Sequence, residues 1–531
     1  MRRWNGWGDD TIDFPLPASA HRFLTEKIGA GNPLPDAAFE EVVKKVPPSR
    51  LPDHPLVLHS PRERLGHARG QSLPDWIALR SGNLGAFPDG VAYPETPEDV
   101  QDLLAYAQAA GATVIPYGGG TSVVGHITPE RAGKPVLTVD LRRMNRLVNL
   151  NKGSQVATFG AGAAGPDIEA QLRAEGFTLG HFPQSFELST VGGWIATRSS
   201  GQQSLRYGRI EQLFAGARMF TPVGPYEIRA FPASAAGPDL GHVVLGSEGR
   251  LGILTEVLVR ITPLPEQERF YVVFFPSWKS ALEGVRRAMQ AKIFLSMLRL
   301  SSPKETETQL ALAGHERLVG LYEKVLAQRG VGPGKCMLVM AVTGTRAQCR
   351  SARRLARRTL KGATGFIAGR YLGGKWAESR FRTPYLRNRL WEEGYGVDTF
   401  ETATDWPNVD QMMTAVESAL QEVVEKEGER VHAFSHLSHL YAQGASVYTT
   451  AIFRLGGNHE ATLTRWQAMK AAASKAIIDH GGTISHQHGI GIDHAPYLSA
   501  EKGELGIEAV KAALRVFDPE GIMNPGKLVR D

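Results

Sequence analysis

Two histidines near the end of the chain are clear candidates for ligand binding or proton transfer. His486 and His488 lie two positions apart in Ser-His-Gln-His-Gly, so an extended backbone would point both imidazoles to one side, just before a glycine turn. His436 and His439 lie in a second histidine-containing stretch. Neutral imidazoles are common zinc ligands, so a metal site has to be considered. We nevertheless expect no metal, because no acidic ligand accompanies the histidines.

The alternative to a metal site is that these histidines bind a phosphate and transfer protons. Tyr448 would then supply a phenol as an acid or base at the substrate end of the site. Arg299 lies among apolar residues at the end of a strand-like run, and Arg387 lies in Thr-Pro-Tyr-Leu-Arg-Asn. A guanidinium offers two parallel donors suited to a phosphate. For either arginine, a partly buried ion pair with a nearby carboxylate is the alternative, and the residues alone favour it.

A glycine-rich loop from Pro116 to Ser122 is the strongest sign of a bound cofactor. A helix pattern capped by Thr96 and a short apolar strand pattern precede it, so three consecutive glycines fall where a strand reaches the surface. Such a loop exposes backbone N–H groups to a phosphate, and a Cβ at Gly119 is expected to stand where a diphosphate approaches. The spacing matches neither G-x-G-x-x-G nor G-x-x-x-x-G-K-[ST], which leaves a diphosphate held without a lysine. A merely flexible turn is the alternative.

Three further loops rich in glycine and hydroxyl groups follow, and four such loops in one domain imply a long ligand with many polar atoms. The predicted cofactor-binding residues are Pro116, Tyr117, Gly118, Gly119, Gly120, Thr121, Ser122, Gln184, Ser185, Phe186, Glu187, Leu188, Ser189, Thr190, Thr197, Arg198, Ser199, Ser200, Glu248, Gly249, Arg250, Leu251, Gly252, Ile253 and Leu254.

The composition is that of a compact protein with two or three domains. The chain has 531 residues, of which 42% are hydrophobic and 21% are charged. Its two cysteines, Cys336 and Cys349, exclude a disulfide framework and cysteine-rich zinc modules. No apolar run approaches the roughly 20 residues that span a bilayer, and we expect a cytoplasmic protein. A net charge of +6 favours anionic partners but is weak evidence for nucleic acid.

The periodic segments predict an α+β fold in four parts. Residues 1–85 form an N-terminal extension that wraps the first domain. Residues 86–265 alternate short β-branched runs with helices, which is typical of a nucleotide-binding domain. Residues 266–495 alternate strands with long helices and carry most of the candidate chemistry, so we expect them to form the substrate domain. Residues 496–531 form a C-terminal segment.

The order of the four loops resembles the vanillyl-alcohol-oxidase or PCMH-type FAD-binding domain, in which the flavin lies between two subdomains. More closely, the chain is similar to the alkyldihydroxyacetone-phosphate synthase family, whose flavoenzymes make the ether bond of ether lipids. The motifs that carry this resemblance are Trp4 to Gly8, Pro116 to Val123, Glu187 to Trp194, Tyr207-Gly208, Gly246 to Gly249 and Ser485 to Gly491. Residues 517–528 resemble the closing stretch of the superfamily, which returns to the flavin domain.

The resemblance implies a two-subdomain FAD-binding domain and a substrate domain, or cap, with an antiparallel sheet. It also implies FAD, which we expect to be non-covalent because the flavin loops contain no histidine or cysteine. The implied reaction is a redox-neutral exchange of the acyl group of acyl-dihydroxyacetone phosphate for a fatty alcohol. The resemblance places Arg387 on the substrate, and the implied catalytic residues are Tyr448, His486, His488, Arg299 and His181.

Three departures from the family pattern keep an alternative open. Gln487 interrupts the family's run of three histidines, Gln184 replaces an acidic residue, and Arg250 replaces a threonine. An FAD-linked oxidase or dehydrogenase of a D-2-hydroxy acid is therefore the second hypothesis. Metal-binding relatives of that kind carry Gly-His-x-Gly-Asp-Gly-Asn-Leu-His where this chain reads Ser438 to Tyr448. A basic nucleic-acid-binding protein without flavin is the third hypothesis, and we expect no nucleic-acid partner.

Seven basic residues between Arg346 and Lys361 follow a helical pattern with interleaved alanines and leucines. A solvated helix face is the simpler interpretation. The alternative is attraction to an anionic bilayer, which would bring an enzyme of fatty alcohols close to its supply. The sequence also leaves open a homodimer.

Overall fold

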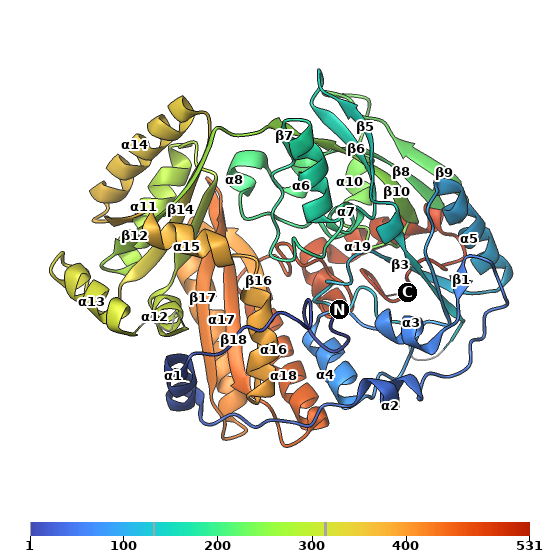
Figure 1. The fold of residues 1–531 in the computed structure, drawn as a ribbon, viewed down its shortest axis with the longest axis horizontal. Coiled ribbons are helices and arrows are strands. Elements are labelled where there is room, and N and C mark those ends of the chain that lie inside the picture. Colours follow the sequence, from blue (N-terminus) through green and yellow to red (C-terminus); the bar gives the residue numbers. More distant parts are fainter. Residues whose placement is uncertain (1, 131–132, 313–315, 531) are drawn as a thin grey trace.

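A computed structural model describes residues 2–130, 133–312 and 316–530. The chain forms two α+β halves side by side (Figure 1), with a large cavity between them. We call the half that carries the predicted flavin loops the flavin half and the half built on the seven-stranded sheet the cap. The predicted α+β class is confirmed.

The first sheet of the flavin half presents the glycine loop. Its order is β1 (Val57–Leu58), β2 (Gly90–Ala92), β4 (Val136–Asp140) and β3 (Thr113–Tyr117), with β2, β4 and β3 parallel and β1 antiparallel to β2. Helix α5 (Pro97–Ala109) precedes β3, and the Thr96 side chain accepts a hydrogen bond from the Asp99 amide at its start. The predicted order of helix, strand and glycine loop is therefore confirmed.

The second sheet of the flavin half is antiparallel and carries the other loops. Its strands, in order, are β5 (Leu147–Asn151), β6 (Val156–Gly160), β10 (Ile253–Arg260), β8 (Phe214–Thr221) and β9 (Gly224–Ile228). Helices α6 (Gly165–Ala174) and α7 (Val191–Thr197) contribute apolar residues to the core that this sheet shares with the first. The loops around Gln184, Ser199 and Glu248 line the cavity between the two halves.

The cap is built on a seven-stranded sheet that is antiparallel throughout, as expected. Its strands, in order, are β15 (Phe366–Gly369), β12 (Gln267–Phe275), β14 (Cys336–Gly344), β13 (Met297–Ser301), β17 (Val431–Leu440), β18 (Gly444–Arg454) and β16 (Tyr395–Asp405).

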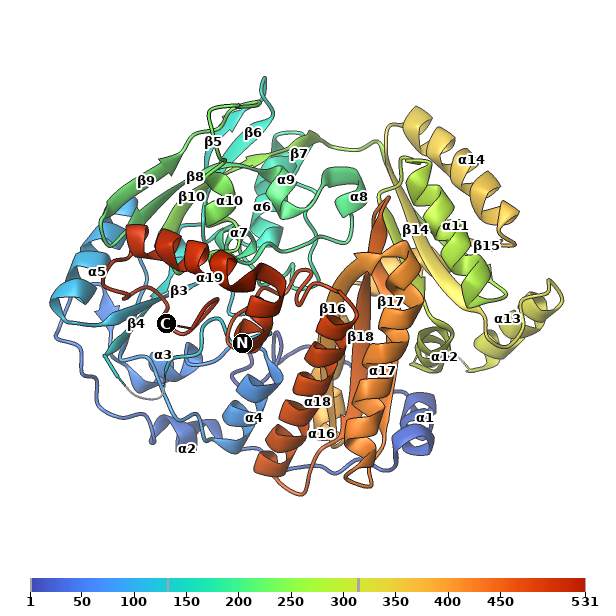
Figure 2. The same cartoon turned by 180° about the vertical axis from the view of Figure 1, so that it is seen from behind.

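Helices cover both faces of the cap sheet. One face packs on α11 (Trp278–Gln290), α14 (Arg346–Gly362), α17 (Val409–Glu425) and α18 (His459–Asp479), and Figure 2 shows α17 and α18 across strands β17 and β18. The other face meets α12 (Pro303–Leu312), α13 (Glu316–Ala327), α15 (Tyr371–Ser379) and α16 (Leu386–Glu392). Because strand side chains alternate between faces, alternate residues of β13, β17 and β18 point from this second face into the cavity.

The N-terminal extension contacts the cap as well as the flavin half that it was predicted to wrap. Helix α1 (Ala18–Ile28) packs on β17 and α12 of the cap, and α3 (Pro61–Gly66) packs on β2 of the flavin half. Helix α2 (Phe39–Val43) packs on α3, and α4 (Leu73–Ser81) packs on α18 and β16. The extension does this because its apolar residues fall into separate short clusters.

Residues 2–8, here called the strap, connect the two halves. The Arg2 guanidinium donates to the Gly119 carbonyl at 2.5 Å. The Trp7 amide donates to the Asn388 side-chain oxygen at 2.9 Å, and the Asn388 side-chain nitrogen donates to the Trp7 carbonyl at 3.0 Å. The strap thereby links the glycine loop to helix α16.

The C-terminal segment returns to the flavin half. After α19 (Leu498–Phe517), the Val114 amide donates to Ile522 and the Asn524 amide donates to Val114, each at 2.8 Å. The boundaries predicted at residues 85, 265 and 495 stay a prediction. Within the part of the chain that the structure describes, no helix is both long and apolar enough to cross a bilayer.

Candidate active site

A cavity of about 1590 Å³ lies between the flavin-half loops and the open face of the cap sheet. This volume exceeds the usual size of a single ligand pocket and suits a large cofactor together with a substrate. The predicted cofactor-binding residues that line it are Pro116, Tyr117, Gly118, Gly119, Gly120, Thr121, Ser122, Gln184, Ser185, Ser189, Thr190, Thr197, Ser199, Ser200, Glu248, Gly249, Gly252 and Leu254. The lining does not include Phe186, Glu187, Leu188, Arg198, Arg250, Leu251 or Ile253.

Close packing between two loops explains the glycines of the first loop. A Cβ on Gly118 would lie 2.3 Å from the Thr190 hydroxyl, and one on Gly119 would lie 1.9 Å from the Leu188 carbonyl oxygen. Gly120 has a φ of +63°, which favours glycine. The expectation that a Cβ at Gly119 would stand in the path of a diphosphate therefore needs correction, because that Cβ points at Leu188.

The flavin-half wall is rich in small residues, hydroxyl groups and backbone donors. Such a wall can follow a long cofactor with a diphosphate, since the glycines leave the backbone uncovered. The predicted residues behind the lining support it in other ways. Phe186 stacks on Phe381 with ring centroids 5.0 Å apart, and the Arg250 guanidinium donates to the Lys527 carbonyl at 3.1 Å.

Glu248 ties the last flavin loop to the histidine motif. Its carboxylate accepts the amides of Ile490 at 2.5 Å and Gly491 at 2.8 Å, and it lies 3.1 Å from the His126 ring. A Cβ on Gly489 would lie 2.8 Å from this carboxylate. Glu248 therefore fixes the loop that carries His486 and His488 against the flavin half.

On the cap wall, Arg299 forms an ion pair with a carboxylate, which was the alternative to phosphate binding for this residue. Its guanidinium donates to the Glu305 carboxylate at 2.7 Å, and the His436 ring lies 2.9 Å from the same carboxylate. Burial opposes ionisation of Glu305, but the charge of Arg299 and the bond to His436 hold its pKa well below the ordinary value. Arg299 nevertheless lines the cavity.

Arg387 has a different environment from Arg299. It lies 4.4 Å above the Trp76 ring and donates to the Gln71 carbonyl at 3.0 Å. Within the described ranges no carboxylate lies at ion-pair distance from it, and burial lowers its pKa. The ion-pair alternative is therefore not seen for Arg387, which lines the cavity and is influenced by the more distant charge of Asp398.

Tyr448 and His488 lie together on the lining. The Tyr448 ring stacks on His436 with centroids 4.8 Å apart and meets His488 edge-on at 5.9 Å. Burial, reinforced by the charge of Glu401, raises the pKa of Tyr448, so the phenol stays protonated near neutral pH. Burial lowers the pKa of His488 below its ordinary value of 6.5, so its imidazole stays neutral.

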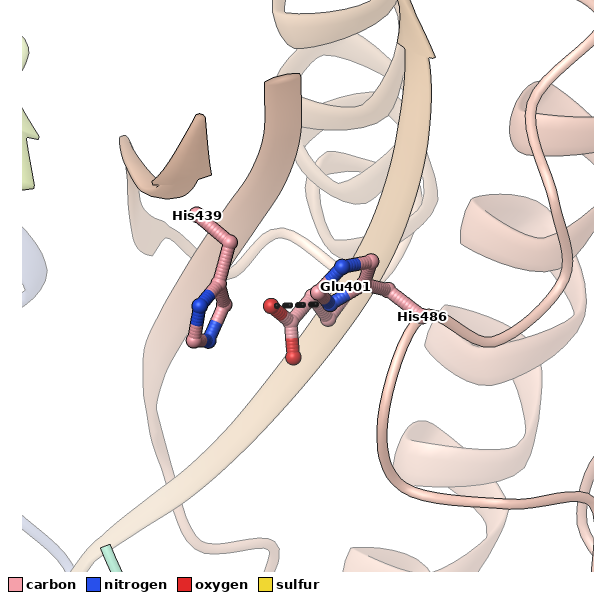
Figure 3. Close-up of side chains that lie close together, drawn as sticks. All are labelled: Glu401, His439 and His486. Carbon is pink, nitrogen blue, oxygen red and sulfur yellow. Dashed lines mark hydrogen bonds and ion pairs between the residues drawn. The ribbon is translucent and has the colours of Figure 1, made fainter. Parts of the chain in front are cut away.

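Glu401 lies behind this pair and contacts two histidines of the motif, of which Figure 3 shows His486, together with His439. Its carboxylate is 3.2 Å from Nδ1 of His486 and 3.7 Å from Nε2 of His488, and it accepts the Ser438 hydroxyl at 2.8 Å. Burial opposes its ionisation, but His486 and then His488 hold the pKa of Glu401 well below its ordinary value. The premise that no acidic group accompanies the histidines is therefore wrong, because strand pairing of β16 with β18 places Glu401 opposite Tyr448.

Glu401, His439 and His486 could offer three metal ligands within 4.8 Å of one another. The surroundings favour a hydrogen-bond network instead. The Nε2 atom of His486 lies 2.9 Å from the Arg209 guanidinium and 2.6 Å from the Tyr441 hydroxyl, so a positive charge already faces the ring. A cation beside a guanidinium would meet repulsion in a buried, low-dielectric site.

His181 and His486 do not line the cavity, unlike the other predicted catalytic residues. The His181 ring lies 2.8 Å from the Ser199 hydroxyl and packs on Trp194. Burial lowers the pKa of His181 to about 3, so it is neutral and supports the flavin loop from behind.

Sequence reasoning missed Glu401, Glu305, Arg209 and Tyr441. Arg209 directly follows the Tyr207-Gly208 motif, which was a usable signal. The two glutamates carry no local signal, because strand and helix packing brings them to the site from distant positions.

The comparisons with known proteins agree with this geometry. The model described as FAD binding domain matches residues 88–227, and the one described as FAD linked oxidases, C-terminal domain, matches residues 264–528. The fold and the cavity therefore define an FAD-linked flavoprotein.

Individual relatives identify the family more closely. The chain is 30% identical to alkyldihydroxyacetonephosphate synthase of Dictyostelium discoideum, over 93% of this chain and 82% of the relative. It is also 30% identical to the Trypanosoma brucei brucei enzyme of that name, over 99% and 92%. A solved alkyldihydroxyacetonephosphate synthase structure superposes with a TM-score of 0.85 at 26% identity, over 99% of both chains. The chain belongs to the alkyldihydroxyacetone-phosphate synthase family.

Proposed function

We propose that the protein is an FAD-dependent alkyldihydroxyacetone-phosphate synthase. It exchanges the acyl group of acyl-dihydroxyacetone phosphate for a fatty alcohol, with no net redox change. The observation that carries this proposal is a single cavity lined by the flavin loops, by Tyr448 with His488, and by the unpaired Arg387.

An apolar arm of the same cavity suits the alkyl chains of both substrates. It runs between α12, α13 and α15 and is lined by Leu310, Leu312, Val325, Leu372 and Trp376. Burial of methylene groups there stabilises binding by about 0.8 kcal/mol for each group. The polar and apolar parts of the lining thus match a phosphorylated head group with a long tail.

Arg387 binds the substrate phosphate, since its guanidinium is buried, charged and free of a carboxylate partner. The chemistry that bound FAD supplies is an attachment point for the three-carbon unit between loss of the acyl group and arrival of the alcohol. The loop from Pro116 to Ser122 and the loops around Ser185 and Ser199 would hold the FAD.

Tyr448 carries the proton transfers at the substrate, and His488 exchanges protons with it. Near neutral pH the phenol is protonated and the imidazole is neutral, so one is ready to donate and the other to accept. Glu401 orients His486 and His488 and keeps their loop in place. We further propose that FAD is bound without a covalent link and that no metal takes part.

A spectroscopic experiment tests the proposed function. Acyl-dihydroxyacetone phosphate, added without oxygen, should bleach the flavin and release fatty acid, and a fatty alcohol should then restore the colour with no electron acceptor. Bleaching by a D-2-hydroxy acid, with recovery only through oxygen or a quinone dye, would establish the oxidoreductase alternative instead. That alternative is kept because Gln487, which lines the cavity, interrupts the histidine run.

We also infer that a cytoplasmic enzyme of this kind touches the membrane through α14. Its inner face buries Cys349, Ala352, Ala356 and Leu360, and its outer face exposes Arg350, Arg353, Arg354, Arg357, Arg358 and Lys361. Vesicles with phosphatidylserine should retain the protein at low salt, and exchange of three of these arginines for glutamine should release it. Equal retention on uncharged vesicles would contradict this contact.

A homodimer stays a prediction that the mass in solution can test.

A further inference from the structure

A buried guanidinium lies along the cavity outside the cluster described above. Arg380 directly follows helix α15, and its side chain is 10% exposed. Its Nε and Nη1 atoms are fully buried and meet no hydrogen-bond acceptor among the residues that the structure describes. Arg380 lines the cavity, so a small rotation of its side chain would bring these donors to a ligand there.

Three aromatic rings surround the Arg380 guanidinium. It lies 5.3 Å from the Phe182 ring centroid, 5.2 Å from Phe270 and 4.8 Å from Phe381. Such rings attract a cation but provide no hydrogen-bond acceptors in their plane. Burial accordingly lowers the pKa of Arg380.

The nearest counter-charge to Arg380 is weakly engaged. The Glu268 carboxylate lies 3.8 Å from Nη1, is 39% exposed, and already accepts a hydrogen bond from the Gln203 side chain. A pair of this length between a buried and a half-exposed group leaves the guanidinium short of hydrogen bonds. An anion in the cavity would supply them.

Arg380 lies between the two kinds of lining. Leu372 and Trp376 are on the preceding turns of α15 and line the apolar arm. Phe182, which contacts Arg380, follows His181 and precedes the flavin loop at Gln184. The guanidinium therefore faces the place where an alkyl chain would enter the polar end of the cavity.

We propose that Arg380 binds the carboxylate of a long-chain fatty acid whose alkyl chain lies in the apolar arm. A guanidinium and a carboxylate match in shape and charge, and two parallel hydrogen bonds are possible between them. This inference rests on the proposed function, in which a fatty acid is the leaving group. It deepens that function by giving the leaving acid a site distinct from Arg387.

The test measures equilibrium binding to the flavin-loaded full-length protein. Palmitate should bind wild type at least about tenfold more tightly than methyl palmitate, which lacks the charge. Arg380→Gln should lower palmitate affinity by at least about tenfold and leave hexadecanol affinity unchanged. Lys375→Gln is the matched control, because Lys375 also lines the cavity but is paired with Glu378, and its palmitate affinity should match wild type.

Each of three results would overturn the inference. One is equal affinity of wild type for palmitate and methyl palmitate, which requires no variant to fold. Another is unchanged palmitate affinity in an Arg380→Gln protein that keeps its flavin spectrum and melting temperature. The third concerns competition with a phosphorylated compound. Dihydroxyacetone phosphate should not displace palmitate, and its displacement by that compound would place the carboxylate at Arg387 instead.

An assay of ether-bond formation beside the binding measurement separates this inference from the proposed function. Absence of ether-bond formation together with palmitate binding that depends on Arg380 would remove the synthase assignment and leave the fatty-acid site. Ether-bond formation together with palmitate binding that ignores Arg380 would leave the synthase and remove the site.

Discussion

The two walls of the cavity are made of different material. The flavin-half wall is built from backbone and small side chains, as where Gly119 meets the Leu188 carbonyl. The cap wall is built from charged and aromatic side chains, including Arg299, Glu305 and Tyr448. The comparison suggests a division of labour in which the first wall fits a cofactor by shape and the second handles charge and protons.

The largest effect should come from damage to the first wall. Gly119→Val puts a side chain into the Leu188 carbonyl, so the loops cannot close and flavin loading should be lost, with at least about 1–3 kcal/mol of destabilisation. Flavin absorbance and thermal melting measure both results. Gly153→Val is the control, because the nearest atom to its Cβ is 3.6 Å away, and it should keep its flavin. A full flavin spectrum in Gly119→Val would show that the loops need not touch.

A smaller effect, confined to chemistry, should follow loss of one hydroxyl from the second wall. Tyr448→Phe should keep the flavin and the fold but slow ether-bond formation by about 10²–10⁴-fold, because the proton donor is gone. Steady-state rates with alkyl product detection measure this loss. Tyr271→Phe, buried on the opposite face of the cap sheet, should retain wild-type rates. Unchanged activity in Tyr448→Phe would move proton transfer elsewhere.

Arg387→Lys keeps the positive charge on the cap wall but removes the two parallel hydrogen-bond donors of the guanidinium. The loss in kcat/KM should correspond to about 2 kcal/mol, or roughly thirtyfold, with the phosphorylated substrate. Arg389, two residues further along α16, pairs with Glu393 instead, so Arg389→Lys should change kcat/KM little. Equal kinetics for Arg387→Lys and wild type would give Arg387 a structural role.

Glu401→Gln should change the pH dependence of the reaction. The Glu401 charge raises the pKa of His488, which burial lowers overall, so its removal should lower that pKa further. Neutral His488 then persists to lower pH, and the acid limb of kcat/KM should move in that direction. Asp405→Asn, at the exposed end of the same strand, should leave the profile in place. An acid limb that moves to higher pH or stays in place would show that the Glu401 charge does not set the pKa of His488.

The smallest effect should come from metal removal. Because Arg209 faces His486, the Glu401 cluster should hold no stoichiometric metal, and chelation should leave activity within error. Elemental analysis of the purified protein measures the content. One zinc per chain that disappears in Glu401→Gln would reverse this expectation.

The two walls also differ in how far the sequence predicts them. The glycine loop and its neighbours are local patterns, so most of the flavin-half lining could be named from spacing and resemblance. Glu401 lies 85 positions before His486 and meets it only because the segment around residues 483–486 lies along β16, where the His486 amide donates to the Glu401 carbonyl. Glu305 similarly meets His436 through the packing of α12 on β17. Contacts between buried charged residues that are far apart in the sequence produce no local sequence pattern.

The strap can dock on the cap only after most of the chain has been synthesised. Trp7 lines the cavity and is held by Asn388, which the ribosome adds 381 residues later. At typical rates of synthesis this separation lasts roughly 20 to 80 s. The side of the cavity that Trp7 covers therefore stays open throughout that interval, long after the flavin-half loops have emerged. A newly made chain has this period in which to take up its cofactor before its first residues dock and cover that side.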